Sequence, residues 1–189
     1  MDVKKDIENA VEILNAGGII LYPTDTIWGL GCDATNENAV KRIFELKRRP
    51  QAKAMISLVD SEESLIQWLE YVPEAALREI RNKKCRPLTV IYDKPKGIAT
   101  PLKADDGSAA FRITNHYYSN ALCAGLGRPI VSTSANYAGD PSPASFNGID
   151  DNIKKEVDYI CKCERESASG SPSRIVKIND EGNVIVIRE

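Results

Sequence analysis

Apolar residues recur along the chain with two spacings, one typical of helices and the other of strands. Val3, Ile7, Val11 and Leu14 stand three or four positions apart, which predicts a helix over residues 3–15. The other expected helices run from Thr35 or Asn36 to just before Pro50, from Asp60 through Leu69, from Pro73 to Arg81, over 119–126, and through Ile149, Ile153 and Val157.

Short apolar runs bounded by turn residues are interleaved with these helices. We expect strands at 19–22, 54–59, 88–92, 109–113, 129–131 and 159–161, and a terminal hairpin of 174–178 and 183–188. This alternation favours an α/β fold. At 189 residues, the chain is long enough to bury a core, and one domain over 1–189 is favoured over two small ones.

The first expected strand is followed at once by polar side chains. Pro23 ends that strand because it has no backbone donor, and Thr24, Asp25 and Thr26 come next. Open α/β sheets bind their ligands at the carboxyl ends of strands, so we expect these residues to form part of a ligand-binding or catalytic site. The nearby pair of glycines at 29 and 31 allows a tight turn or a close approach of the backbone to another group.

A basic cluster lies at the end of the second expected helix. Residues 41–53 hold one acid, Glu45, and six cations: Lys41, Arg42, Lys47, Arg48, Arg49 and Lys53. The cluster is a candidate anion site where the helix breaks and the chain returns to the sheet. The alternative is a solvated helix face, because cations are favoured near a helix C-terminus by the helix dipole.

A second polar cluster, Ser132-Thr133-Ser134-Ala135-Asn136, comes just past the expected strand at 129–131. Its position again indicates a ligand site, although such a cluster can equally form a turn in which hydroxyls cap backbone groups. The loop at 93–107 is either a lid or a long surface connection, and its sequence does not separate the two.

The charge balance narrows the possible partners. Twenty-five Lys and Arg against 27 Asp and Glu give a formal charge of −2, so the basic cluster is local and duplex nucleic acid is a poor candidate. The N-terminal ten residues carry charges where a signal peptide needs an apolar run, and no run approaches membrane-spanning length. We therefore expect a cytoplasmic protein.

The cysteines and the single histidine indicate no metal site. Five cysteines lack C-x-x-C spacing, and His116 is the one histidine of the sequence, so zinc is improbable. A catalytic pair of Cys32 and His116 stays open as a hypothesis, but buried structural cysteines are the default. The sequence also lacks a phosphate-binding P-loop and a complete dinucleotide fingerprint. Cations, hydroxyls and an amide at strand ends favour phosphoryl or nucleotidyl transfer.

Four segments together resemble the YrdC-like family of threonylcarbamoyl-adenylate synthases. They are Tyr22-Pro23-Thr24-Asp25-Thr26, Gly29-Leu30-Gly31-Cys32-Asp33, Leu46-Lys47-Arg48-Arg49-Pro50 and Ser132-Thr133-Ser134-Ala135-Asn136. The Lys-x-Arg and Ser-x-Asn signature of the family falls on Lys47, Arg49, Ser134 and Asn136, which are therefore the expected catalytic residues.

The resemblance implies a twisted, mixed open sheet with flanking helices and a concave basic face. It implies a reaction in which L-threonine, bicarbonate or CO2, and ATP give threonylcarbamoyl-AMP and pyrophosphate. The product serves t6A formation at position 37 of tRNA through partner proteins of that pathway. Magnesium is expected on the triphosphate of ATP, and no carboxylate cluster predicts a metal held by the protein.

The family pattern also assigns substrate contacts. Threonine contacts fall on Thr26, Arg112, Ser132 and Ser173, and ATP contacts on Arg49, Lys53, Ser108, Ser134, Ser142 and Arg188. The chain departs from the pattern at Leu58, where some relatives have a histidine, at Arg86 within Lys84-Cys85-Arg86-Pro87, and at Arg174. It is similar to the short form of the family, without an added C-terminal domain.

Two alternatives of other classes stay open. The first is a non-catalytic RNA-binding protein that uses the same basic face, with weak tRNA binding. Such proteins usually interleave aromatic residues with cations, whereas Tyr22 and Trp28 are the aromatic residues near the cluster. The second is a carbamoyl-transfer maturation module, a kind of domain that normally sits within a much longer chain.

Overall fold

One mixed sheet organises the chain in the computed structural model, which describes residues 2–48, 55–82, 86–166, 170–179 and 181–189. Within these ranges the strand order is β7-β1-β2-β6-β3-β5-β4-β8-β9, with both parallel and antiparallel neighbours. The strands are β1 (Ile20–Tyr22), β2 (Gly29–Gly31), β3 (Ile56–Val59), β4 (Leu88–Tyr92), β5 (Ala109–Ile113), β6 (Ile130–Ser134), β7 (Tyr159–Ile160), β8 (Arg174–Ile178) and β9 (Val184–Arg188).

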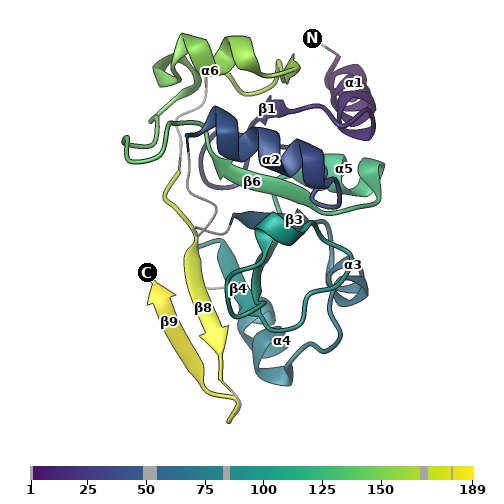
Figure 1. Cartoon of the computed structure of the whole chain (residues 1–189), viewed down its shortest axis with the longest axis vertical. Helices are drawn as coiled ribbons and strands as arrows, with labels where there is room; N and C mark the ends of the chain where they lie inside the picture. Colours follow the sequence, from purple (N-terminus) through teal and green to yellow (C-terminus); the bar gives the residue numbers. More distant parts are fainter. Residues whose placement is uncertain (1, 49–54, 83–85, 167–169, 180) are drawn as a thin grey trace.

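The helices flank this sheet, as the α/β prediction requires (Figure 1). They are α1 (Val3–Asn15), α2 (Glu37–Leu46), α3 (Glu62–Gln67), α4 (Glu74–Arg81), α5 (Tyr117–Leu126) and α6 (Asp151–Glu156), with short 3-10 turns η1 (Thr100–Leu102) and η2 (Phe146–Gly148). Among the described residues, none of these helices has the length and apolar character needed to cross a membrane.

Each face of the sheet packs against its own helices. Neighbouring residues of a strand point to opposite faces. Leu21 of β1 therefore joins the core that includes α2, whereas Ile20 and Tyr22 join the core formed with α1 and α5. Leu58 and Val59 of β3 divide in the same way. Helices thus cover both faces over the β1–β6–β3 half of the sheet.

Strand β6 lies between β2 and β3 in the sheet, and it is longer than its apolar run predicts. It pairs antiparallel with β2 on one side, where Gly29 faces Ser134, and antiparallel with β3 on the other. The polar residues Ser132, Thr133 and Ser134 are therefore part of the strand, whereas we expected them to follow its end. Ladder hydrogen bonds to two neighbouring strands compensate for the low strand propensity of serine.

The two glycines expected at a turn form strand β2 instead. Gly31 pairs with Ile20 of β1, and an added Cβ there would lie 2.6 Å from Cε1 of Tyr22 and 2.8 Å from the carbonyl oxygen of Val131. The expected close approach of the backbone is thus confirmed, and the tight turn is not found. A three-residue strand rich in glycine carries no β-branched signal for sequence analysis to detect.

The loop at 93–107 is packed and is not a free lid. Ile98, Ala99 and Leu102 are buried in the same core as α2, and the backbone N–H of Ala99 donates to the carbonyl of Ala34 at 2.8 Å. Of the two possibilities left open by the sequence, the structure favours a fixed connection.

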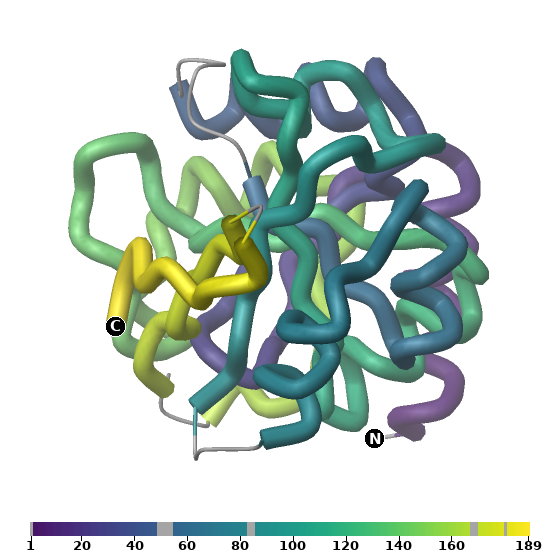
Figure 2. The backbone as a smooth tube through the Cα atoms, turned by 90° about the horizontal axis from the view of Figure 1, so that it is seen from below, coloured from purple at the N-terminus to yellow at the C-terminus, as the bar shows by residue number. Residues whose placement is uncertain are grey.

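The predicted terminal hairpin is confirmed. Strand β8 runs parallel to β4, and β9 folds back antiparallel on β8 as the last strand of the sheet. The hairpin is the yellow pair of strands beside β4 in Figure 1, and Figure 2 shows it away from the N-terminus. It brings residues from the end of the chain to the same face as residues from β5 and β6.

Candidate active site

A cleft of about 240 Å³ opens on the sheet face that α1 and α5 cover elsewhere. Ser132 and Ser134 share this face with Ile130 of the α1/α5 core, because they follow it at two-residue spacing. Arg112 shares it too, because it pairs in register with Leu58 of the same core. The cleft therefore continues the sheet face beyond the area covered by helices.

The structure brings together most of the residues expected to contact substrates. All four expected threonine contacts line the cleft: Thr26, Arg112, Ser132 and Ser173. Three of the expected ATP contacts line it as well: Ser134, Ser142 and Arg188. They come from the segment after β1, from β5, β6 and β9, and from the loops before η2 and β8, so the fold unites residues up to 162 positions apart.

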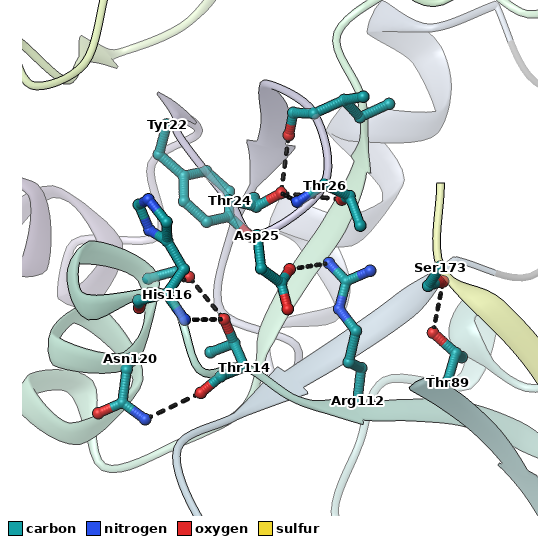
Figure 3. Close-up of polar contacts among 12 residues, drawn as sticks. Tyr22, Thr24, Asp25, Thr26, Thr89, Arg112, Thr114, His116, Asn120 and Ser173 are labelled. Atoms are coloured by element: carbon teal, nitrogen blue, oxygen red, sulfur yellow. Dashed lines mark hydrogen bonds and ion pairs between the residues drawn. The ribbon is translucent and has the colours of Figure 1, made fainter. Parts of the chain in front are cut away.

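Arg112 is the buried cation of this cleft. Its residue is 3 % exposed, and its Nη2 lies 3.1 Å from Oδ1 of Asp25 in an ion pair whose geometry falls short of a hydrogen bond (Figure 3). Its Nε is buried and has no hydrogen-bond partner within the described chain. A buried N–H donor without a partner costs free energy, and a carboxylate bound in the cleft supplies a suitable acceptor.

Hydroxyl groups surround this arginine. Thr24 Oγ1 lies 3.0 Å from Thr26 Oγ1 and donates to the carbonyl of Ile27 at 2.7 Å, which holds the segment after β1 in place. On the other side of the cleft, Ser173 Oγ lies 2.8 Å from Thr89 Oγ1 (Figure 3). Hydroxyls that can both donate and accept suit a ligand with an amine, a hydroxyl and a carboxylate.

A second arginine faces the same cleft from β9. Arg188 donates from Nη2 to the carbonyl of Ser173 at 2.8 Å and from Nε to the same oxygen at 3.1 Å. Burial lowers the pKa of Arg188 from its ordinary value, and the nearby positive charge of Arg112 lowers it further. Two neighbouring cations make the cleft suitable for anionic groups such as carboxylate and phosphate.

Lys47 and Asn136 organise the wall of the cleft behind Ser134. Lys47 is almost fully buried, and its Nζ donates to the carbonyls of Ser134 and Asn136, the latter at 2.6 Å. The Asn136 side chain donates from Nδ2 to the carbonyls of Tyr137 and Asp140. These contacts fix the segment that follows β6.

Ser108 does not line the cleft, although the family pattern assigns it to ATP. Its Oγ donates to Asp106 Oδ1 at 2.6 Å, and its backbone N–H donates to the same oxygen at 2.9 Å. These two hydrogen bonds, together with one from Lys177, lower the pKa of Asp106 to about 2. Two further expected contacts, Arg49 and Lys53, lie outside the described residues.

The three departures from the family pattern occupy different surroundings. Leu58 is fully buried in the α1/α5 core, so it contributes packing. Arg86 and Arg174 line another cavity, of about 600 Å³, and Arg174 pairs there with Glu79 at 3.1 Å.

The structure argues against the cysteine–histidine hypothesis. Cys32 is fully buried in the α2 core, and burial raises the pKa of its thiol far above the ordinary range. His116 instead places Nε2 3.0 Å from Oε2 of Glu164. Because burial disfavours the thiolate that a cysteine nucleophile needs, Cys32 acts as a small apolar core residue. Within the described chain, no three His, Cys, Asp or Glu residues gather as a metal-binding group.

Sequence reasoning assigned no role to Asp25 or to Thr89. Both contact an expected site residue in the structure, Asp25 through Arg112 and Thr89 through Ser173. Their partners are 87 and 84 positions away in the sequence, so no local pattern could have linked them.

Comparison with known proteins identifies the family of this chain. A family model described as Sua5/YciO/YrdC, telomere recombination, matches residues 12–189. The chain belongs to the Sua5/YciO/YrdC family. It is 33% identical over 186 residues to threonylcarbamoyl-AMP synthase of Xanthomonas euvesicatoria pv. vesicatoria, with 97% of each chain covered. It is 34% identical over 171 residues to the protein of that name from Xanthomonas oryzae pv. oryzae, with 89% of this chain and 91% of that one covered.

Solved structures of this family have the same fold. P. abyssi Sua5 complexed with L-threonine is 28% identical, with a TM-score of 0.86 over 100% of this chain, which spans 54% of that longer chain. E. coli YciO is 26% identical, with a TM-score of 0.84 over 98% of this chain and 89% of YciO. Full-length HypF, at 20% identity and a TM-score of 0.81, is similar in fold alone, and the match covers 28% of its length.

Proposed function

We propose that the chain is an L-threonylcarbamoyladenylate synthase. It forms threonylcarbamoyl-AMP and pyrophosphate from L-threonine, bicarbonate or CO2, and ATP. The observation that carries the proposal is the buried Arg112 residue, which lines a cleft rich in hydroxyls and whose Nε has no hydrogen-bond partner among the described residues. Support comes from relatives named threonylcarbamoyl-AMP synthase that match nearly the whole chain, and from a Sua5 relative complexed with L-threonine.

The threonine part of the site combines one charge with several hydroxyls. Arg112 binds the substrate carboxylate, because a guanidinium offers several N–H donors in a fixed plane. Thr26, Ser132 and Ser173 bind the amine and the hydroxyl. This arrangement holds threonine with its nitrogen available to react.

The reaction itself forms two bonds and breaks one P–O bond of ATP. Bicarbonate, where it is the carbon source, first gives CO2 and hydroxide. The neutral amine attacks the carbon of CO2, and the proton that the nitrogen loses passes to that hydroxide or to water, which gives a carbamate. A carbamate oxygen then attacks the α-phosphorus of ATP, and pyrophosphate leaves with the electron pair of the broken bond. The positive charges that surround the phosphates stabilise the negative charge that develops in this step.

The ATP part of the site is proposed from Ser134, Ser142 and Arg188 in the cleft, together with Arg49, Lys53 and Ser108. Lys47 and Asn136 hold the backbone that presents Ser134. Magnesium arrives with ATP and neutralises part of the triphosphate charge. We place the catalytic domain across residues 1–189, and we propose that the product passes in the cytoplasm to partner proteins that form t6A37 on tRNA.

The proposal predicts a reaction with three required substrates. The purified chain is incubated with ATP, L-threonine and bicarbonate, and pyrophosphate release and the mass of the AMP-containing product are measured. We expect both signals to disappear when threonine or bicarbonate is omitted. Equal pyrophosphate release without any amino acid contradicts the proposal. Tight tRNA binding without turnover favours the RNA-binding alternative.

A matched pair of variants links this activity to the cleft. Arg112→Gln removes the buried guanidinium and is expected to weaken threonine binding by about a hundredfold, which leaves a KM that can still be measured. Arg174→Gln removes an arginine that pairs with Glu79 and lines the other cavity, so it is expected to leave threonine binding intact.

A further inference from the structure

Asp25 holds the guanidinium that faces the proposed threonine site. The Asp25 Oδ1 to Arg112 Nη2 distance is 3.1 Å, and the two side chains are 12 % and 2 % exposed (Figure 3). Asp25 lies in the segment that follows β1, between two threonines whose side chains are fixed by hydrogen bonds to each other and to the backbone. The carboxylate is therefore presented to Arg112 by a rigid segment.

Asp25 approaches Arg112 from outside the cleft. Arg112 and Ile113 are neighbours on β5, so their side chains point to opposite faces of the sheet. Arg112 lines the 240 Å³ cleft, whereas Ile113 and Asp25 line the cavity of about 600 Å³. Asp25 does not line the cleft, so it does not face the space where the substrate binds. Any effect of Asp25 on threonine passes through Arg112.

Arg112 needs this carboxylate because another cation lies close by. The positive charge of Arg112 lowers the pKa of Arg188, whose guanidinium donates a hydrogen bond to the carbonyl of Ser173. Without Asp25, the buried Arg112 lies near the exposed Arg188 without that acid, and mutual repulsion favours movement of the Arg112 side chain. With Asp25 present, Nη2 is engaged in an ion pair, whereas Nε has no hydrogen-bond partner among the described residues.

We propose that Asp25 is the positioning residue of the threonine site: it fixes the Arg112 guanidinium so that the remaining N–H donors meet the substrate carboxylate. This inference rests on the proposed function. In this proposal, Asp25 contacts neither threonine nor ATP. Its loss therefore weakens threonine binding and raises the KM for threonine, and it leaves the KM for ATP nearly unchanged.

Two variants of Asp25 and one matched control test the proposal. L-threonine affinity is measured by calorimetry, the KM values for threonine and ATP by pyrophosphate release, and stability by thermal unfolding. Asp25→Ala is expected to weaken threonine binding by about tenfold or more. Asp25→Asn is expected to weaken it by about threefold, because the amide oxygen keeps a partial negative charge beside Nη2 but the full charge of the ion pair is lost. The control is Asp33→Ala, which removes a similar buried acid that pairs with Arg128 at 2.7 Å, away from the cleft. It is expected to lower the unfolding temperature without changing threonine affinity.

A double-mutant cycle separates positioning from a merely structural role. In an Arg112→Gln background, adding Asp25→Ala is expected to change the KM for threonine by less than about twofold, because the residue through which Asp25 acts is gone. An undiminished effect in that background overturns the proposal, and so does unchanged threonine affinity in Asp25→Ala. If Asp25→Ala does not fold, Asp25→Asn decides, and unchanged threonine affinity in that variant overturns the proposal. Failure of the unaltered chain to bind threonine overturns the proposed function, and this inference with it.

Discussion

Lys47 donates a hydrogen bond from Nζ to the carbonyl oxygen of Asn136 across 2.6 Å, and so joins the end of α2 to the segment after β6. The same ammonium also donates to the carbonyl of Ser134. Two halves of the family signature, 89 positions apart, are thus in direct contact. The charge of Lys47 acts on the protein backbone, and the backbone in turn presents Ser134 to the cleft.

This contact predicts that Lys47→Met loses both stability and activity. Two carbonyls at a buried site lose their donor, at a cost of about 1–3 kcal/mol for each buried group left unsatisfied. We expect the unfolding temperature to fall by about 5 °C or more and kcat/KM for ATP to fall by about tenfold or more. The control is Lys41→Met, because Lys41 is a half-exposed partner of Glu37 on the same helix. Equal unfolding temperatures for the two variants would contradict the prediction.

Arg49 and Arg42 form a second pair for comparison. Arg49 lies outside the described residues and belongs to the family signature, so Arg49→Ala is expected to lower kcat/KM for ATP by about a hundredfold or more. Arg49→Lys is expected to rescue little, because an ammonium lacks the planar fork of a guanidinium. Arg42 pairs with Asp158 at 3.1 Å on an exposed part of α2. Arg42→Ala is therefore expected to change kinetics little, and similar small effects of both changes would mean that the cluster is surface charge. Circular dichroism checks folding.

Cys32→Ala and His116→Ala are expected to retain most activity. Burial raises the pKa of the Cys32 thiol and so disfavours the thiolate, and His116 is engaged by Glu164. Any loss is expected in stability, because Cys32 is part of the core. A hundredfold loss of kcat in either folded variant would favour a covalent mechanism.

Asp6 predicts a pH-dependent contribution to stability. Burial raises the pKa of this carboxyl, but hydrogen bonds from Tyr159, Tyr118 and the backbone of residues 162 and 163 together outweigh burial and leave the pKa below its ordinary value. A depressed folded-state pKa stabilises the protein above the unfolded-state pKa of about 3.9, and the contribution is lost as the pH falls through that value to the folded pKa.

The measurement compares unfolding temperatures of the unaltered chain and Asp6→Asn between neutral pH and about pH 3. The unaltered chain is expected to be more stable near neutral pH, and its advantage is expected to shrink as the pH falls below about 4. Tyr118→Phe with Tyr159→Phe removes two donors to Asp6 and should flatten this dependence. A constant difference across the range would contradict the assignment to Asp6.

Serine is expected to serve less well than threonine as a substrate. The cleft also contains Ile27, Ile56 and Ile175, which offer apolar surface to the threonine methyl. Burial of one methyl contributes about 1 kcal/mol, which corresponds to a preference of about fivefold in kcat/KM. Equal kcat/KM values for the two amino acids would show that the methyl is not enclosed.

The local elements follow closely from the sequence. The helical spacing of Val3 to Leu14 predicts α1 with its observed bounds, and the runs at 88–92 and 109–113 coincide with β4 and β5. Such elements are predictable because a helix or strand with one or two buried faces places apolar residues at a fixed period. The resemblance to the family, carried by four short segments, added the expected substrate contacts.

Other features depended on pairing between distant segments. Gly29–Gly31 became a strand because β1 and β6 lie on either side of it, and β6 reached Ser134 because β2 and β3 provide hydrogen-bond partners. Ser108 binds Asp106 and does not face the cleft.

By itself, therefore, the sequence determined the type and order of most helices and strands and the strand ends at which polar groups gather. The tertiary structure alone decided which of those groups meet. It paired Asp25 with Arg112, Ser173 with Thr89, and Lys47 with the carbonyls of Ser134 and Asn136. The physical reason is that periodicity reports the environment of a residue within its own element, whereas an ion pair or a hydrogen bond depends on the register and packing of elements far apart in the chain.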